Sequence, residues 1–295
     1  MVNSTPLRER FRLWVKSSSI LAPIKRVIPD MLKSKMLKFV AGGQAGSISL
    51  GNDVMLKYDL DDWYWPRYVR NIRSYEPEIW FFADRYFNPD VVFIDCGANI
   101  GLWSCYAASK IKNRNQVIAV ECSDSILPRL RQNRALNREN FTLIEKAIWS
   151  RSGETKVFTV YRGHASSSLV ASDPDREQVH QISVQTVSID DIAGRTLEIS
   201  PNLTDFIVKL DVEGVEREAL AGAKRILHEK DTLLIYEDHG QDTESVTTAY
   251  ISSVRLKLVL PLGKPESARV SRDVKVSPIS TLTQLRGSYE SGTCK

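Results

Sequence analysis

The segment Val91–Gly101 constrains the fold most strongly, because an apolar run leads there into an acid and two glycines. An apolar run that ends in Asp95 is typical of a buried strand, and Leu102–Lys110 has the pattern of a helix. Gly97 and Gly101 carry no Cβ, so the connecting backbone can approach a ligand closely. The free N–H groups at the start of a helix favour a carboxylate or a phosphate. The segment therefore predicts a strand, a turn and a helix that together bind a ligand.

A second apolar run, Val117–Val120, ends in Glu121, 20 residues after Gly101. An acid at the tip of the second strand is placed to bind a ribose diol. The glycines are spaced G-x-x-x-G, whereas a dinucleotide-binding fold favours G-x-G-x-x-G. These features predict a nucleoside-type ligand lying across the carboxyl ends of parallel strands.

From residue 91 onward, short apolar strands alternate with amphipathic helices, which indicates an α/β fold with helices on both faces of a parallel sheet. Two further strands, 256–260 and 268–276, would complete a mostly parallel seven-stranded sheet of Rossmann-like type with an antiparallel C-terminal strand pair. The other expected strands are 91–95, 117–121, 141–145, 205–210 and 232–237, and the expected helices lie near 100–110, 124–137 and 215–229.

The chain is expected to divide into a basic N-terminal extension, a main domain and a short polar tail. The extension, 1–74, contains a helical segment and a hairpin near 47–58, and the tail is 286–295. The main domain, 75–285, carries a β insertion at about 154–188, expected as an antiparallel pair joined by a loop. Residues 1–40 hold nine Lys and Arg against two acids. We expect an amphipathic helix packed on the main domain there, with a weak membrane-surface contact as the alternative.

Composition excludes several classes of protein. The net charge of +4 is too small to argue for a nucleic-acid partner. No apolar run approaches the ~20 residues of a membrane-spanning helix. The four cysteines show no metal-ligand spacing and are typical of a reducing compartment. We therefore expect a cytoplasmic protein, with its oligomeric state left open.

Charged residues also follow the expected strand 205–210. Lys209 and Asp211 lie two residues apart and share a face, and a buried Lys209 should be paired because an isolated buried charge is costly. Glu213 and Glu216 follow directly; the alternative is that they only favour the N-terminus of the next helix. Since ligands bind at the carboxyl ends of such strands, this segment is a candidate site.

A third acidic strand end is Leu233–His239, in which Glu237 and His239 share a face. The neutral imidazole of His239 could take a proton from a substrate hydroxyl, although a loop histidine can also be structural. Asp211, Glu237 and His239 could instead bind a divalent cation, but no spacing demands one, and we assign no metal ligands. The loop 162–169 suits either a lid or a solvated hairpin tip.

The pattern Asp95-x-Gly97-Ala98-Asn99-x-Gly101, followed by a strand ending in Glu121, resembles the S-adenosylmethionine site of Rossmann-like methyltransferases. Over about residues 70–240 the chain resembles the FkbM family of these enzymes. The Cys122 that follows Glu121 is a departure, because proline is usual there. The matches, in chain order, are Tyr75–Glu78, Asp95–Gly101, Glu121, Asn133 with Asn137, Ala147, Ser166–Leu169, Val187–Asp191, Lys209–Glu216, Leu220–Ala223 and Glu237 with His239.

The resemblance implies S-adenosylmethionine as cofactor and O-methylation of a small-molecule or glycan hydroxyl. We expect His239 to be the base, helped by Glu237 or Asp211, with Lys209 and Glu213 in the same site. The alternatives are a nicotinamide-dependent oxidoreductase and a non-catalytic domain that kept the fold. The residues implied to bind the cofactor are Glu76, Asp95, Gly97, Asn99, Gly101, Glu121 and Ala147.

Overall fold

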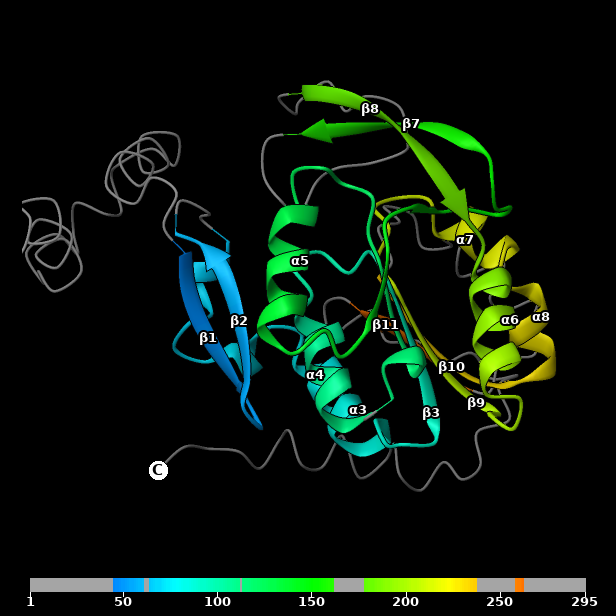
Figure 1. Ribbon diagram of the computed structural model, residues 1–295, viewed down its shortest axis with the longest axis horizontal. Helices are drawn as coiled ribbons and strands as arrows, with labels where there is room; N and C mark the ends of the chain where they lie inside the picture. The colour runs from blue at the N-terminus through cyan, green and yellow to red at the C-terminus, as the bar shows by residue number, and fades with distance from the viewer. Residues whose placement is uncertain (1–44, 61–63, 112, 162–177, 238–257, 263–295) are drawn as a thin grey trace, which may run out of the picture.

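A six-stranded parallel sheet lies at the centre of the computed structural model, which describes residues 45–60, 64–111, 113–161, 178–237 and 258–262 (Figure 1). Its order is β11-β10-β9-β3-β4-β5, so β3 lies between its successor β4 and the much later β9. The strands are β3 (Val91–Cys96), β4 (Val117–Val120), β5 (Thr142–Ile144), β9 (Asp205–Leu210), β10 (Asp231–Glu237) and β11 (Leu258–Leu262).

Helices cover both faces of this sheet, as the alternation of strands and helices predicted (Figure 1). Successive strand residues point to opposite faces, so Phe93 and Ile207 join one core while Ile94 and Val208 join the other. The first core is closed by α3 (Pro77–Tyr86), α4 (Leu102–Lys110) and α5 (Leu127–Leu136), and the second by α6 (Ile189–Ile199), α7 (Glu216–Ala221) and α8 (Lys224–Glu229).

The predicted N-terminal hairpin is present as β1 (Ala45–Gly51) and β2 (Val54–Asp59), which pair antiparallel. Asn133 of α5 and Asn137, the C-cap of this helix, fasten β2, the strand of the hairpin nearer the main sheet. Asn133 accepts from the N–H of Lys57 at 2.7 Å and donates to the carbonyl of the same residue at 2.9 Å. Asn137 bonds the N–H and carbonyl of Met55 in the same way. The two side chains thus take the place of a neighbouring strand and fix the hairpin to the first core.

Replacing Asn133 with alanine is expected to lower the free energy of unfolding by about 2–4 kcal/mol, because it leaves the N–H and C=O of Lys57 and the C=O of Ile100 without their partner. Asn133→Asp keeps an acceptor but loses both donated bonds, so it should also be destabilised. Urea unfolding measures both changes, with the exposed Asn202→Ala as the matched control. Equal stability of Asn133→Ala and Asn202→Ala would show that the hairpin is held by apolar packing alone.

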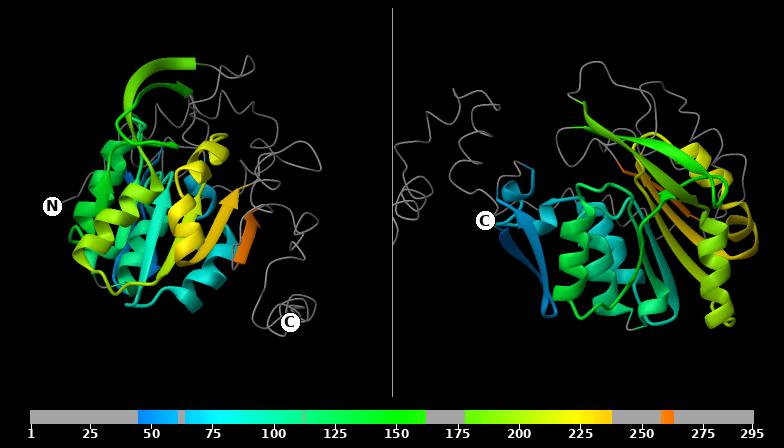
Figure 2. Two further views of the ribbon diagram at one scale, coloured as in Figure 1. Left: turned by 90° about the vertical axis from the view of Figure 1, so that its right-hand side faces the viewer. Right: turned by 45° about the horizontal axis from the view of Figure 1, so that its top comes forward.

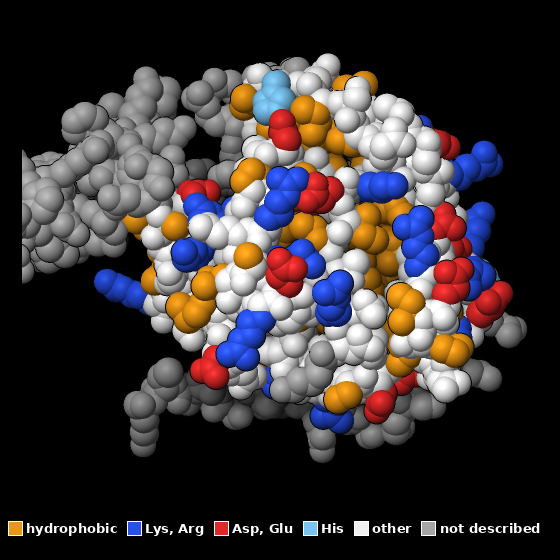
Figure 3. Space-filling view, in the orientation of Figure 1, with side chains coloured by type: hydrophobic (Ala, Val, Ile, Leu, Met, Phe, Trp, Pro, Cys, Tyr) orange, Lys and Arg blue, Asp and Glu red, His pale blue; other side chains and the backbone are white. Residues whose placement is uncertain are grey.

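The predicted antiparallel insertion is confirmed as β7 (Thr155–Tyr161) and β8 (Gln178–Val187), and the residues that join them lie outside the described part. A short strand not foreseen from the sequence, β6 (Ala147–Ile148), pairs parallel to β8 and completes a three-stranded sheet. This sheet arches over the carboxyl ends of the main strands (Figure 1, Figure 2). On the face seen in Figure 3, basic and acidic side chains are interspersed.

The prediction of a single helix over 215–229 is wrong, because the chain forms α7 and α8 with a break at Gly222 and Ala223. A Cβ at Gly222 would lie 2.4 Å from the carbonyl oxygen of Trp149, so the backbone packs there too closely for a side chain. The Asp190 carboxylate accepts hydrogen bonds from the second and third N–H groups of α8 at 2.9 and 3.0 Å. This tertiary cap starts a new helix. The expected Ser188 cap of α6 is present.

The C-terminal end of the sheet also differs from the expectation. The strand predicted at 256–260 is β11, and it pairs parallel to β10, so the antiparallel arrangement expected there is not seen in this strand. The strand expected at 268–276, the basic segment 1–40 and the tail 286–295 lie outside the described residues. Among the helices that are described, none has the length and apolar character to cross a bilayer.

Candidate functional site

The site is built where the strand order reverses, between β3 and β9. From β3 the chain continues to β4 on one side, whereas the strand on the other side of β3 is β9, which comes much later in the chain. The connections diverge at this point and leave a crevice at the carboxyl ends of the strands. Hydrogen bonds tie the three strand ends together. The N–H groups of Gly97 and Ala98 both donate to the carbonyl of Val120 at 3.0 Å. The N–H of Asp211 donates to the carbonyl of Cys96 at 3.1 Å.

Both glycines of the turn have positive φ, but each also has a packing role. At Gly97, with φ +79°, a Cβ would lie 1.8 Å from the carbonyl oxygen of Asp211. The turn therefore needs glycine to approach the exit of β9, in addition to the approach to a ligand expected from the sequence. At Gly101, with φ +88°, a Cβ would lie 2.6 Å from Leu130 Cδ1. Gly101 precedes the first residue of α4 and does not line the pocket.

Glu121 holds the turn against the exit of β4. Its Oε2 accepts from the N–H of Asn99 at 2.9 Å, and its Oε1 accepts from the N–H groups of Cys122 and Ser123, both at 2.9 Å. Burial raises the pKa of Glu121, and these hydrogen bonds from Ser123, Asn99 and Cys122 oppose the rise. The departure at Cys122 has a physical consequence here, because proline has no N–H to donate to the carboxylate.

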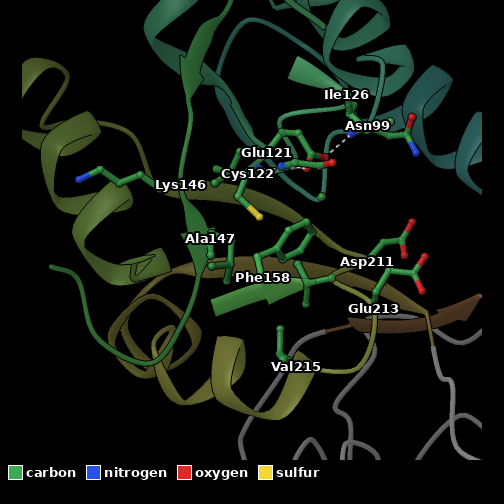
Figure 4. Close-up of a pocket in the computed structure, with 15 residues that line it drawn as sticks. Asn99, Glu121, Cys122, Ile126, Lys146, Ala147, Phe158, Asp211, Glu213 and Val215 are labelled. Carbon is green, nitrogen blue, oxygen red and sulfur yellow. Dashed lines mark hydrogen bonds between the residues drawn. The ribbon is translucent and has the colours of Figure 1, made fainter. Parts of the chain in front are cut away.

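A pocket opens beside this turn and includes the expected residues Gly97, Asn99, Glu121 and Ala147 (Figure 4). The space inside it, counting the part open to solvent, is about 630 Å³. Asn99 lies along one side of the view with two acids that follow β9. The acids are Asp211 and Glu213. Apolar side chains of Ala147, Phe158 and Val215 lie across from them, and Ile126 lies beside Asn99.

Next to the pocket, Lys209 is buried among carboxylates and is only 3% exposed. Its Nζ donates to Asp211 Oδ2 at 3.0 Å. Burial alone would lower the pKa of Lys209, but the charges of Asp211, Glu76 and Asp95 outweigh it and raise the pKa above its ordinary value. Lys209 is therefore a fixed ammonium group. We refer to these four residues as the Lys209 cluster, and Asp211 belongs both to it and to the pocket.

Asp95 and Lys209 are register partners in β3 and β9. Asp95 Oδ2 accepts from the Ser104 hydroxyl at 2.6 Å, whereas Oδ1 is buried and has no hydrogen-bond partner among the described residues. Burial raises the pKa of Asp95, and the Lys209 charge opposes this rise. A buried carboxylate oxygen without a partner is costly, so this atom marks a place where a bound donor or cation would be stabilised.

Glu76 reaches the cluster from the start of α3, where it has a left-handed backbone with φ +43°. Its Oε2 accepts from Trp103 Nε1 at 2.6 Å. Burial raises the pKa of Glu76, and the Lys209 ammonium opposes the rise. The cluster thus holds three carboxyl groups around one ammonium group, an excess of acids that favours a cationic ligand next to it.

The structure therefore brings most of the expected residues into one region. Glu237 is the last residue of β10, next to β9, and His239 lies outside the described residues. Lining residues that were not predicted from the sequence include Phe158 of β7, which the insertion contributes, and Ile126 and Lys146. An antiparallel strand pair was expected in the insertion, but nothing in the sequence placed one of its faces over the pocket.

Within the described ranges, no group of three or more His, Cys, Asp or Glu side chains is arranged to hold a metal ion. The alternative cation site of Asp211, Glu237 and His239 stays a prediction, because His239 lies outside those ranges.

No curated protein and no solved structure matches the chain. A family model, described as the methyltransferase FkbM domain, matches residues 95–258. The matched range covers more than half of the 295 residues. It includes the glycine turn, Glu121, the insertion and the exit of β9. The chain thus belongs to the FkbM methyltransferase family.

Proposed function

We propose that this protein is an S-adenosylmethionine-dependent O-methyltransferase that acts on a hydroxyl of a sugar, a glycan or a natural product. The observation that carries the proposal is the position of Asp211. It lines the pocket beside the glycine turn and is also bonded to the buried Lys209. The pocket proposed to bind the methyl donor, here called the donor pocket, and the Lys209 cluster, which is the charged centre proposed to act on the acceptor, therefore meet at Asp211.

The residues present fit the proposed cofactor. Glu121 lines the pocket and retains lone pairs for a ribose diol, since a carboxylate offers about four acceptor sites and three are in use. Phe158, Ile126 and Ala147 provide an apolar wall for a purine. The Oδ1 of Asp95, which has no partner among the described residues, and the carboxyl groups of the Lys209 cluster suit an ammonium and a sulfonium. When bound, S-adenosylmethionine supplies a methyl group that is electrophilic because it is attached to a positive sulfur.

The protein's own task is then to align an acceptor oxygen and remove its proton. Lys209 cannot act as the base, because its raised pKa keeps it protonated. We assign it a positioning role, in which it orients Asp211. We propose His239 as the base from its place two residues after the end of β10, with Asp211 or Glu237 assisting. This base would take the proton of the acceptor hydroxyl while the methyl carbon exchanges its bond to the cofactor's sulfur, which leaves as a neutral thioether, for a bond to the acceptor oxygen.

The experiment that tests the proposed function uses S-adenosylmethionine carrying a heavy-isotope methyl group. The protein is incubated with a glycan and metabolite extract, once with the heavy donor and once with the ordinary one, and products are separated by mass. We expect at least one hydroxylated compound to gain a methyl group with the isotope difference, which hydrogen iodide cleavage would show to be bound to oxygen. A methyl group found only on nitrogen, carbon or sulfur would contradict the O-methylation proposed.

Replacing Glu121 with glutamine is expected to weaken S-adenosylhomocysteine binding about ten- to hundred-fold, because a charge-assisted contact to the ribose is lost. The exposed Glu145→Gln, which removes a carboxylate paired with Arg131, is the control and should bind normally. Calorimetry measures both affinities, and thermal melting checks that the turn held by Glu121 is intact. If the folded Glu121→Gln protein binds as well as the control, another acid holds the ribose.

A further inference from the structure

A group of aromatic side chains lies directly before α3. Tyr64, Tyr68 and Tyr75, here called the tyrosine cluster, contact one another edge to face, with ring centroids 5.0–5.9 Å apart. All three are partly exposed. Trp65 is buried beneath them and contacts Tyr64 and Tyr75 at 5.4 and 5.3 Å. The cluster is therefore a preformed surface supported by the first core.

The direction of α3 places this cluster at the catalytic end of the sheet. The helix begins after Glu76, which belongs to the Lys209 cluster, and ends at Tyr86, which lines a separate cavity at the amino ends of β3, β9 and β10. Residues immediately before Glu76 must accordingly lie near the carboxyl ends of the strands of the main sheet. The segment is fixed there, because the indole N–H of Trp80 in α3 donates to the carbonyl of Ile72 at 3.2 Å.

Hydrogen bonds connect the tyrosine cluster to the charged centre. The side chains of Tyr64 and Tyr75 are hydrogen-bonded to each other, and Tyr75 is also bonded to Glu76. The charges of Glu76 and Asp211 both contribute to raising the pKa of Tyr64 to about 12, after the larger effect of burial. A molecule seated on the rings would thus lie next to Asp211, which borders the donor pocket.

We propose that the tyrosine cluster is the acceptor-binding surface and that it recognises the C–H face of a sugar ring. This inference rests on the proposed function and names the acceptor class. Aromatic faces carry partial negative charge, so they attract the weakly positive C–H groups on one face of a pyranose. The carboxylates beside the rings then accept hydrogen bonds from the ring hydroxyls. Residues 64–75 precede the range 95–258 that the family model matches.

The test measures sugar binding directly by saturation-transfer NMR, with the protein saturated with S-adenosylhomocysteine. The probes are the methyl glycosides of glucose, mannose, galactose and rhamnose, with 4-ethylphenol as a non-sugar hydroxyl. We expect transfer to the C–H protons of at least one glycoside. Tyr68→Ala should weaken that binding about three- to ten-fold, whereas Tyr68→Phe, which keeps the ring, should bind normally.

The matched control is Tyr86→Ala, which removes a tyrosine at the opposite end of the sheet and should leave glycoside binding unchanged. Retained affinity for S-adenosylhomocysteine shows that each variant is folded. Binding of 4-ethylphenol but of no glycoside would overturn the sugar assignment, as would equal losses in Tyr68→Phe and Tyr68→Ala. Unchanged glycoside binding in Tyr68→Ala would overturn the site while leaving the methyltransferase intact. A wild-type protein that binds no S-adenosylhomocysteine would overturn the proposed function itself.

Discussion

Lys209→Met is expected to lower the free energy of unfolding by about 3–5 kcal/mol at neutral pH, because removing one partner of a buried ion pair leaves an uncompensated charge. Lys209 is 3% exposed and faces three carboxylates, so methionine would fill the space but supply no positive charge. The exposed Lys224→Met, on the first turn of α8, is the matched control and should change the stability little.

The pH dependence of this loss follows from the acids around Lys209. Burial already raises the pKa of Asp95 and of Glu76, and the Lys209 charge opposes that rise. Without the Lys209 charge, the pKa values of Asp95 and Glu76 rise further in the folded protein. A folded state that binds more protons than the unfolded state loses stability as pH increases. The destabilisation should therefore be smallest near pH ~4, close to the ordinary carboxyl values, and grow toward neutral pH.

Urea unfolding of wild type, Lys209→Met and Lys224→Met at several pH values measures this change. If the difference between wild type and Lys209→Met is the same at every pH, Lys209 contributes by packing and not by charge, and its assigned role as the counter-ion of the acids is wrong.

His239→Ala is expected to reduce kcat by about 10²–10⁴-fold while leaving cofactor affinity almost unchanged, because it removes the proposed general base but no proposed cofactor contact. The matched control is His228→Ala, since His228 is exposed on α8 and, in the described structure, its ring bonds only the carbonyl of Lys224. Single-turnover kinetics separates the chemical step from acceptor binding and product release.

The activity of the wild-type protein should rise with pH through the range in which imidazole loses its proton, near ~6.5 before perturbation by neighbouring acids. Asp211→Asn should also reduce kcat, because Asp211 borders the donor pocket and is oriented by Lys209. Full activity of His239→Ala together with loss of activity on chelation would instead favour a cation that activates the hydroxyl.

Much of this architecture could be predicted because the signals were local. The apolar runs that end in Asp95, Glu121 and Lys209 specify buried strands with charged tips, and parallel pairing brings those tips together. The hairpin at 47–58 and the cap at Ser188 were also predictable from turn and capping residues close in sequence.

The rest depended on contacts between segments that are distant in sequence. Asn133 and Asn137 match the family within an expected helix, but nothing in the sequence showed that their amides pair with the backbone of β2, 76 and 82 residues away. Asp190 caps a helix that begins 34 residues later (224 − 190). Phe158 reaches the pocket only because β6 carries the insertion back over the sheet. None of these pairings leaves a periodic pattern in the sequence.

The most direct test of the central claim is the calorimetric titration of the purified protein with S-adenosylmethionine and, separately, with NAD. Glu121 and the Asp95 oxygen without a partner lie at a G-x-x-x-G turn, not at the G-x-G-x-x-G turn that a nicotinamide dinucleotide favours. We expect S-adenosylmethionine to bind with one molecule per chain and NAD to give no heat of binding. Binding of NAD without binding of S-adenosylmethionine would contradict the methyltransferase assignment and favour an oxidoreductase on the same fold.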